Sequence, residues 1–181
     1  PKLRLNQGNK PHCVAFAGLG NMLAAPLMSD PGYNTIQIYN ECQQNDEWEG
    51  ENYDGTSVRA LMKVLESHGW ISGYVWGQSI DEAVAWMNGG FGTVIVGTNW
   101  YQCMDDIDTK GFICSPATIA TPIGGHAYRI NWYDAKKDGF LVVNSWGENW
   151  GAKRPKGGLT GMAWLRRTDL ERLLLEDGEI T

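Results

Sequence analysis

The apolar segment at residues 13–28 (CVAFAGLGNMLAAPLM) constrains the fold of this chain more than any other feature. Its apolar side chains fall on nearly every face of a helix: Val14, Phe16, Ala17, Leu19, Met22 and Leu23. A helix that is apolar all round is stable only where other elements cover it. The segment therefore predicts a buried central helix that begins just after Pro11 and holds Cys13 in its first turn.

Capping signals predict three more helices. A side-chain oxygen at the N-cap accepts a bond from a free backbone N–H, a Glu three residues later can return the bond, and glycine readily ends a helix. The signals are Thr56 or Ser57 with Gly69 as the stop, Ser79 with Glu82, and Thr168 with Glu171.

Strand-like runs occupy the second half of the chain, at residues 92–100, 126–133 and 139–146. The last two are joined through Asp138-Gly139, which is a hairpin signal. Because helices dominate the first half and antiparallel strands the second, we predict an α+β fold with a cleft where the halves meet. The acidic stretch 45–55 lacks the ligand spacing of a calcium loop and is expected to be a solvated loop.

Length and charge exclude several classes of protein. A chain of 181 residues predicts a single domain, 1–181. A net charge of −6 with dispersed basic residues argues against a nucleic-acid partner. No apolar run has membrane-spanning length and no signal-peptide pattern is present, so we expect a soluble protein without a membrane partner, compatible with the cytoplasm, its localisation otherwise open.

Four cysteines (Cys13, Cys42, Cys103 and Cys114) are too few for a disulfide scaffold of this length. A Cys103–Cys114 bridge and two unpaired thiols are equally compatible with the sequence. Since no C-x-x-C or H-x-x-x-H pattern is present, we expect neither a metal site nor a cofactor.

The position of Cys13 raises the question of whether it is an inert core residue, a metal ligand or a nucleophile. A thiol attacks as thiolate, and a helix N-terminus lowers a cysteine pKa, so a nucleophile is a chemically sound hypothesis. Such a nucleophile needs a base and a group that orients the base. His126, which begins a strand after Gly124-Gly125, is the candidate base, and Asn144 is the candidate orienting residue because the hairpin can bring the two together.

Gln7 completes the candidate set. Its side-chain amide, beside the backbone N–H of Cys13, could hold the oxyanion of a tetrahedral intermediate. Taken singly, each of these four residue types is more often structural than catalytic.

Three motifs in register carry a family resemblance. Residues 7–16 (QGNKPHCVAF) resemble the Q-G-x-x-x-x-C-x-A-F signature of papain-like cysteine peptidases, residues 125–130 (GHAYRI) their histidine motif, and residues 144–151 (NSWGENWG) their asparagine motif. The resemblance implies a two-lobed fold, mainly helical over about 1–90 and mainly β over about 91–181, with Cys13 and His126 facing each other across the cleft.

The same resemblance implies roles for three more residues. Gly55 would pair its backbone with the substrate, Trp146 would cover the His126–Asn144 hydrogen bond, and Trp150 would form a wall on the leaving-group side. The motif region departs from the family at Val14, where an aromatic residue is usual. Its other departures are Lys10 in place of a disulfide-bonded cysteine, and Pro11 and His12 in place of small residues. His12 brings a second imidazole near the thiol.

We therefore expect a cysteine endopeptidase that acts on a peptide or protein substrate through Cys13, His126, Asn144 and Gln7. A catalytically silent peptide-binding module and a cell-wall peptide hydrolase are the alternatives. The chain is shorter than most family members and shows no inhibitory pro-segment. A removed pro-segment, a protein inhibitor, or a compact bacterial or phage member controlled in another way all stay open.

Overall fold

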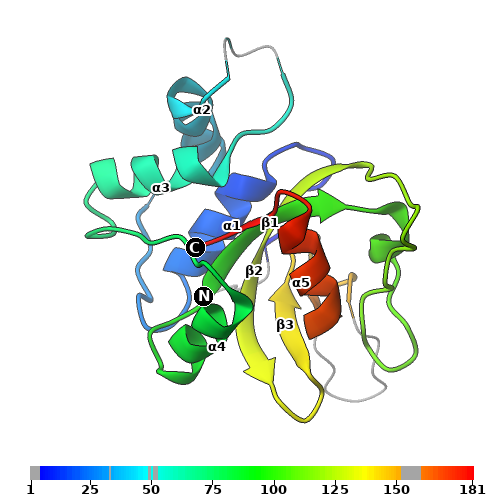
Figure 1. Cartoon of the computed structure of the whole chain (residues 1–181). Helices are drawn as coiled ribbons and strands as arrows, with labels where there is room; N and C mark the ends of the chain where they lie inside the picture. The colour runs from blue at the N-terminus through cyan, green and yellow to red at the C-terminus, as the bar shows by residue number, and fades with distance from the viewer. Residues whose placement is uncertain (1–4, 33, 49, 51–52, 152–159) are drawn as a thin grey trace.

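A computed structural model describes residues 5–32, 34–48, 50, 53–151 and 160–181. Four helices come first: α1 (Cys13–Met22), α2 (Thr35–Asn45), α3 (Val58–Ser67) and α4 (Ile80–Asn88). The remaining elements are β1 (Val94–Trp100), the 3-10 helix η1 (Gln102–Asp105), β2 (Gly124–Asp134), β3 (Gly139–Val143), β4 (Met162–Arg166), α5 (Arg167–Leu175) and β5 (Glu179–Ile180). The predicted α+β class is confirmed, and Figure 1 shows the helices of the first half grouped beside the sheet.

Helix α1 is the buried helix that the apolar segment predicts. It contacts α2 and α3 on one side and β1 and β2 on the other. Gly18 permits the close approach of α3, since a Cβ there would lie 2.5 Å from Cδ1 of Leu61. The helix ends at Met22, so Pro26 lies outside it.

Helix α2 is absent from the sequence predictions. Asn34 caps it through a reciprocal pair with Gln37, an N-x-x-Q variant of the capping box. Its core contacts come from Ile38, Tyr39 and Cys42, all buried. The pattern is detectable in the sequence, but few apolar side chains accompany it.

The predicted caps are correct for two helices and wrong for one. Ser57, rather than Thr56, accepts the bond at the start of α3, and Ser79 accepts the backbone N–H of Glu82 at the start of α4. Helix α5 begins at Arg167 and not after Thr168. Strand β4 runs directly into this helix, so Arg166 holds the N-cap position with extended backbone.

The five strands form one antiparallel sheet in the order β4-β3-β2-β1-β5. The predicted hairpin joins β2 and β3, and Asp138 adopts a positive φ of 46° in its turn. Strands β4 and β5 were not expected, and β3 ends at Val143, three residues before the predicted end at 146. Asn144 therefore lies just outside the sheet, free to turn toward β2.

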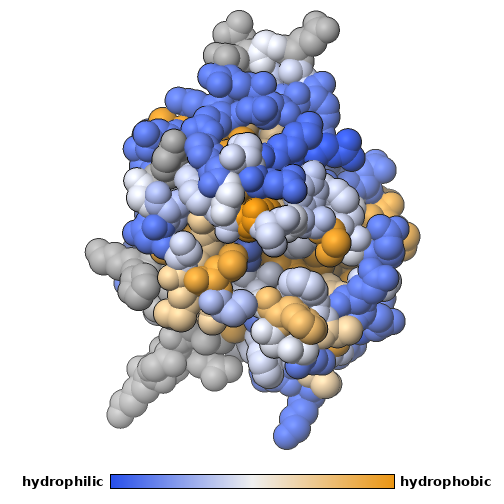
Figure 2. Space-filling model, turned by 90° about the vertical axis from the view of Figure 1, so that its left-hand side faces the viewer, coloured by the Kyte–Doolittle hydropathy of each residue, from blue (hydrophilic) through white to orange (hydrophobic). Residues whose placement is uncertain are grey.

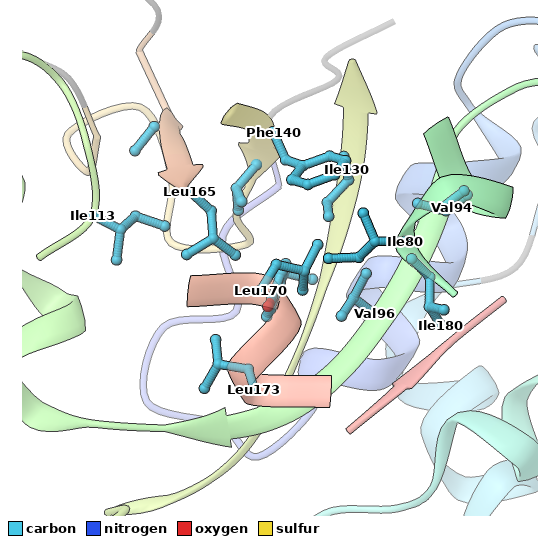
Figure 3. Close-up of a cluster of buried hydrophobic side chains, with 14 of the residues drawn as sticks. Ile80, Val94, Val96, Ile113, Ile130, Phe140, Leu165, Leu170, Leu173 and Ile180 are labelled. Atoms are coloured by element: carbon cyan, nitrogen blue, oxygen red, sulfur yellow. The ribbon is translucent and has the colours of Figure 1, made fainter. Parts of the chain in front are cut away.

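Strand alternation separates two apolar cores. Val94 and Val96 of β1 pack with α4, α5 and β5, as the close-up in Figure 3 shows, whereas Ile95 packs with the helices α1 to α3. Ala127 of β2 also faces these helices. The sheet thus has one face toward α1, whose first residue is Cys13.

Among the described residues, no helix is both long and apolar enough to cross a membrane.

Candidate active site

Cys13 is the first residue of α1 and is partly exposed. Burial raises its pKa above the ordinary value, and this effect exceeds the opposing bonds from the backbone N–H groups of Ala127, Val14 and Cys13 itself. The N–H groups at the start of the helix act in the expected direction, but burial has the larger effect on the pKa of Cys13. Helix α1 packs against β2, and Cys13 belongs to the same cluster as Ala127, the residue after His126.

His126 and Asn144 form the predicted pair. Nε2 of His126 lies 2.9 Å from Oδ1 of Asn144, which also accepts the backbone N–H of Ser145 at 2.8 Å. Since the amide oxygen accepts, this geometry assigns the ring proton to Nε2. Nδ1 is then the ring nitrogen that can take a proton from a thiol.

Aromatic rings enclose His126. Trp146 stacks on its ring at 4.9 Å between centroids, and Trp100 meets it edge-on at 4.8 Å. Burial lowers the pKa of His126 to about 4, while the Asn144 hydrogen bond opposes the shift. Trp150 contacts Trp146 in a T-shaped arrangement, so it belongs to the same aromatic group.

The sequence analysis missed Trp100 and Asp105. Trp100 donates from Nε1 to Oδ1 of Asp105 at 2.9 Å, and the Asp105 carboxylate acts to raise the pKa of His126. The pairing of Thr98 with His126 in β1 and β2 explains why Trp100 reaches this ring. The sequence alone could place Trp100 at His126 only if the register between β1 and β2 were known.

Gln7 forms hydrogen bonds with Ser145 and with Lys10. Its backbone N–H donates to the carbonyl of Ser145 at 2.7 Å, and its Oε1 accepts the Ser145 hydroxyl. Its Nε2 donates to the Lys10 carbonyl at 2.7 Å. A side-chain amide has two N–H donors, so one remains for another acceptor. Ser145, which the sequence analysis did not single out, thus connects Gln7 with Asn144.

Gly55 has its contacts with side chains of α2. Its φ of 102° is one that glycine adopts readily. Its N–H lies 3.2 Å from the Tyr39 hydroxyl oxygen, and its carbonyl accepts from Gln43 at 3.4 Å. A peptide that paired with this backbone would have to replace these bonds to α2 residues.

The contacts of His12 are those of a residue that supports the start of α1. It is the N-cap residue of α1, and its ring stacks on Tyr39 at 4.1 Å between centroids. Burial, and then the charge of Lys10, lower its pKa. No group of three His, Cys, Asp or Glu side chains among the described residues could hold a metal ion.

The bridge that the sequence left open is not formed. Cys103 and Cys114 are both free thiols, and Sγ of Cys103 donates to the Cys114 carbonyl at 3.8 Å. Burial and the neighbouring Cys114 raise the pKa of Cys103. Neither thiol begins a helix or lies beside a histidine ring among the contacts described, so neither has the groups that would activate a nucleophile.

An apolar groove of about 960 Å³ lies at the other end of α1. It is lined by the end of α1, by residues 70–78 and by α4, with Trp70, Trp76 and Trp86 among its walls. Figure 2 shows apolar surface gathered in the middle and lower part of this side of the molecule, below a hydrophilic upper part. None of the candidate catalytic residues lines this groove.

Comparisons with known proteins define the class of fold. No protein-family model and no curated protein matches the sequence. Among solved structures, xylellain, a cysteine protease from Xylella fastidiosa, superposes with a TM-score of 0.69 at 21% identity over 93% of this chain and 77% of that one.

Two further structures are similar at lower identity. Procathepsin B S9 from Trypanosoma congolense gives a TM-score of 0.67 at 10% identity over 98% of this chain and 70% of that one. Digestive procathepsin L 3 from the larval midgut of Tenebrio molitor gives 0.62 at 13% identity over 97% and 64%. The chain therefore has the fold of the papain-like cysteine proteases, which confirms the predicted two-lobed α+β fold class.

Proposed function

We propose that this chain is a cysteine peptidase, a single peptidase domain over residues 1–181, that hydrolyses internal peptide bonds. The observation that carries the proposal is the His126–Asn144 hydrogen bond of 2.9 Å, with Trp146 stacked on the His126 ring. Cys13 begins α1, the helix that packs on β2 beside this pair. These contacts support Cys13 as the nucleophile, His126 as the base and Asn144 as the orienting group, each supplied by a different segment.

In the first half of the reaction, the Cys13 thiol gives its proton to Nδ1 of His126 while the sulfur attacks the peptide carbonyl carbon. Burial disfavours charge on both groups in the free protein, because it raises the pKa of Cys13 and lowers that of His126. The thiolate and imidazolium form together and attract each other in this poorly solvated site.

The carbonyl oxygen then carries the negative charge. The second Nε2 N–H of Gln7 and the backbone N–H of Cys13 are the proposed donors to it. The tetrahedral intermediate collapses as His126 returns its proton to the leaving amine, and the acyl group remains on sulfur as a thioester. Water, deprotonated by His126, hydrolyses the thioester, releases the acid product and restores the thiol.

The remaining assignments concern substrate binding. Trp150, which extends the aromatic group from Trp146, is the proposed wall for the leaving-group side. Gly55 is the proposed backbone partner of the acyl side, on condition that its bonds to Tyr39 and Gln43 open.

A peptide library with blocked termini tests the proposal. Mass spectrometry should detect cleavage at internal bonds by the parent protein and none by Cys13→Ala, while Cys103→Ala, a control at another partly exposed thiol, should retain cleavage. Binding of library peptides without cleavage would favour the silent peptide-binding module. Cleavage of cell-wall peptides alone would favour the cell-wall hydrolase.

A further inference from the structure

Arg129 is a buried charge without a partner. It lies on β2 and is 2% exposed. Its Nε, Nη1 and Nη2 atoms find no hydrogen-bond acceptor within the described part of the chain. Burial is the cause that lowers its pKa to about 10. Because a guanidinium keeps its charge and its five N–H donors in a protein, this arrangement calls for a compensating group.

The guanidinium points toward α1. Arg129 lies two residues after Ala127, so strand alternation places both on the sheet face that α1 covers. A Cβ added at Gly20 would lie 3.3 Å from Nη1 and 3.9 Å from Cδ1 of Leu5. The absence of a side chain at Gly20 therefore leaves space next to the guanidinium.

A small cavity occupies this space. Its walls include Leu5, Phe16, Gly20, Arg129, Asn144 and Ser145. The centre of a water-sized sphere can move through about 10 Å³ of it, which is room for one small species. Nδ2 of Asn144 is also buried without an acceptor among the described residues. The unpaired polar side-chain atoms of Arg129 and Asn144 at this cavity are thus all N–H donors.

We propose that the cavity is a site for one small monovalent anion of the halide type, held by the Arg129 guanidinium and the Asn144 amide. A water molecule could accept two of these bonds but would leave the arginine charge uncompensated, whereas an anion satisfies the donors and the charge together. Large oxyanions exceed the space.

The site has a consequence for the candidate catalytic pair. An anion that accepts from Nδ2 of Asn144 fixes the amide with Oδ1 toward His126, the orientation seen in the structure. This consequence rests on the proposed peptidase function; the anion site itself does not.

Thermal unfolding of Cys13→Ala protein tests the site independently of catalysis. The melting temperature is measured at constant ionic strength while sodium chloride replaces sodium gluconate, whose anion is too large for the cavity. A ligand that binds only the folded state should raise it by roughly 3–6 °C for each tenfold increase in chloride above the dissociation constant.

Substitutions and diffraction complete the experiment. Arg129→Met and Gly20→Ala should abolish the chloride response, and Lys136→Met, which removes an exposed positive charge, should leave it intact. Crystals of the Cys13→Ala protein in bromide should show anomalous signal beside Arg129, a result that needs no folded Arg129 variant. Equal melting temperatures in chloride and gluconate, or the absence of an anomalous bromide signal beside Arg129, would overturn the proposal.

Discussion

The indole of Trp146 lies against the imidazole of His126, with 4.9 Å between ring centroids and 29° between ring planes. The stack covers a side chain that is 8% exposed and whose pKa is lowered to about 4, with burial as the largest cause. Trp146 is therefore expected to control both the water access and the proton affinity of His126.

Replacing Trp146 by Ala should raise the pKa of His126 toward its ordinary value of 6.5, because water can then solvate the imidazolium. An NMR titration of the histidine ring protons measures the shift. Trp132 is an exposed tryptophan on β2, the strand that also holds His126. Trp132→Ala should leave the titration unchanged. An unchanged titration in Trp146→Ala would show that the indole does not set the solvation of this ring.

Asn144 and His126 should differ in the size of their effects on turnover. His126→Ala removes the base, whose role is typically worth about 10²- to 10⁴-fold in rate, and Asn144→Ala removes only its orientation, so its loss in kcat should be smaller by about tenfold or more. Kinetics of both variants on one substrate decide the point. Equal losses would indicate that Asn144 mainly holds the fold together.

Gln7→Ala should lower kcat by roughly 10²- to 10³-fold with little change in KM, as expected for the loss of one oxyanion donor. It should also reduce thermal stability, since Gln7 has side-chain bonds to Ser145 and Lys10. Turnover is therefore measured on folded protein after active-site titration. A kcat within about threefold of the parent would limit Gln7 to a structural role.

Acid should destabilise the protein through His126. Its pKa is about 4 when folded and near 6.5 when unfolded, so between these values the unfolded chain binds a proton that the folded chain does not. The contribution of His126 to the free energy of unfolding is fully present above pH 6.5. It falls by up to about 3 kcal/mol as the pH drops toward 4. Urea unfolding across this range should show a smaller loss in His126→Gln.

His12 contributes in the same direction, because burial lowers its pKa as well. His12→Gln and the double variant with His126→Gln separate the two contributions. A parent stability that stays constant from pH 6.5 to 4 would contradict the burial of a neutral imidazole at either position.

Local patterns were enough to predict the structure around His126 and Asn144. Asp138-Gly139 gave the hairpin, and the hairpin predicted their proximity. The sequence did not predict helix α2, because its polar sequence has little apolar periodicity. Helix α5 begins before its predicted cap, because strand β4 runs directly into it. The first miss reflects a weak local signal, and the second reflects a strand–helix junction that overrides the local cap.

The site's electrostatics were less accessible to sequence reasoning. The N–H groups at the helix N-terminus favour a Cys13 thiolate, but the burial that opposes them depends on tertiary packing around the thiol. Trp100 and Ser145 reach the site through strand register and through contacts between distant segments. In the sequence, Arg129 is an ordinary residue of a predicted strand. Only the structure shows that its buried guanidinium has no hydrogen-bond acceptor among the described residues.

Covalent labelling with a peptidyl epoxide, followed by peptide mapping, tests the central claim most directly. Cys13 should take up one equivalent of the probe in parallel with the loss of peptide cleavage. Cys42, whose pKa burial raises to about 12, and the thiols of Cys103 and Cys114 should stay unmodified on the same timescale. Labelling that appears first on one of these three cysteines, or that persists undiminished in Cys13→Ala, would contradict the assignment of Cys13 as the nucleophile.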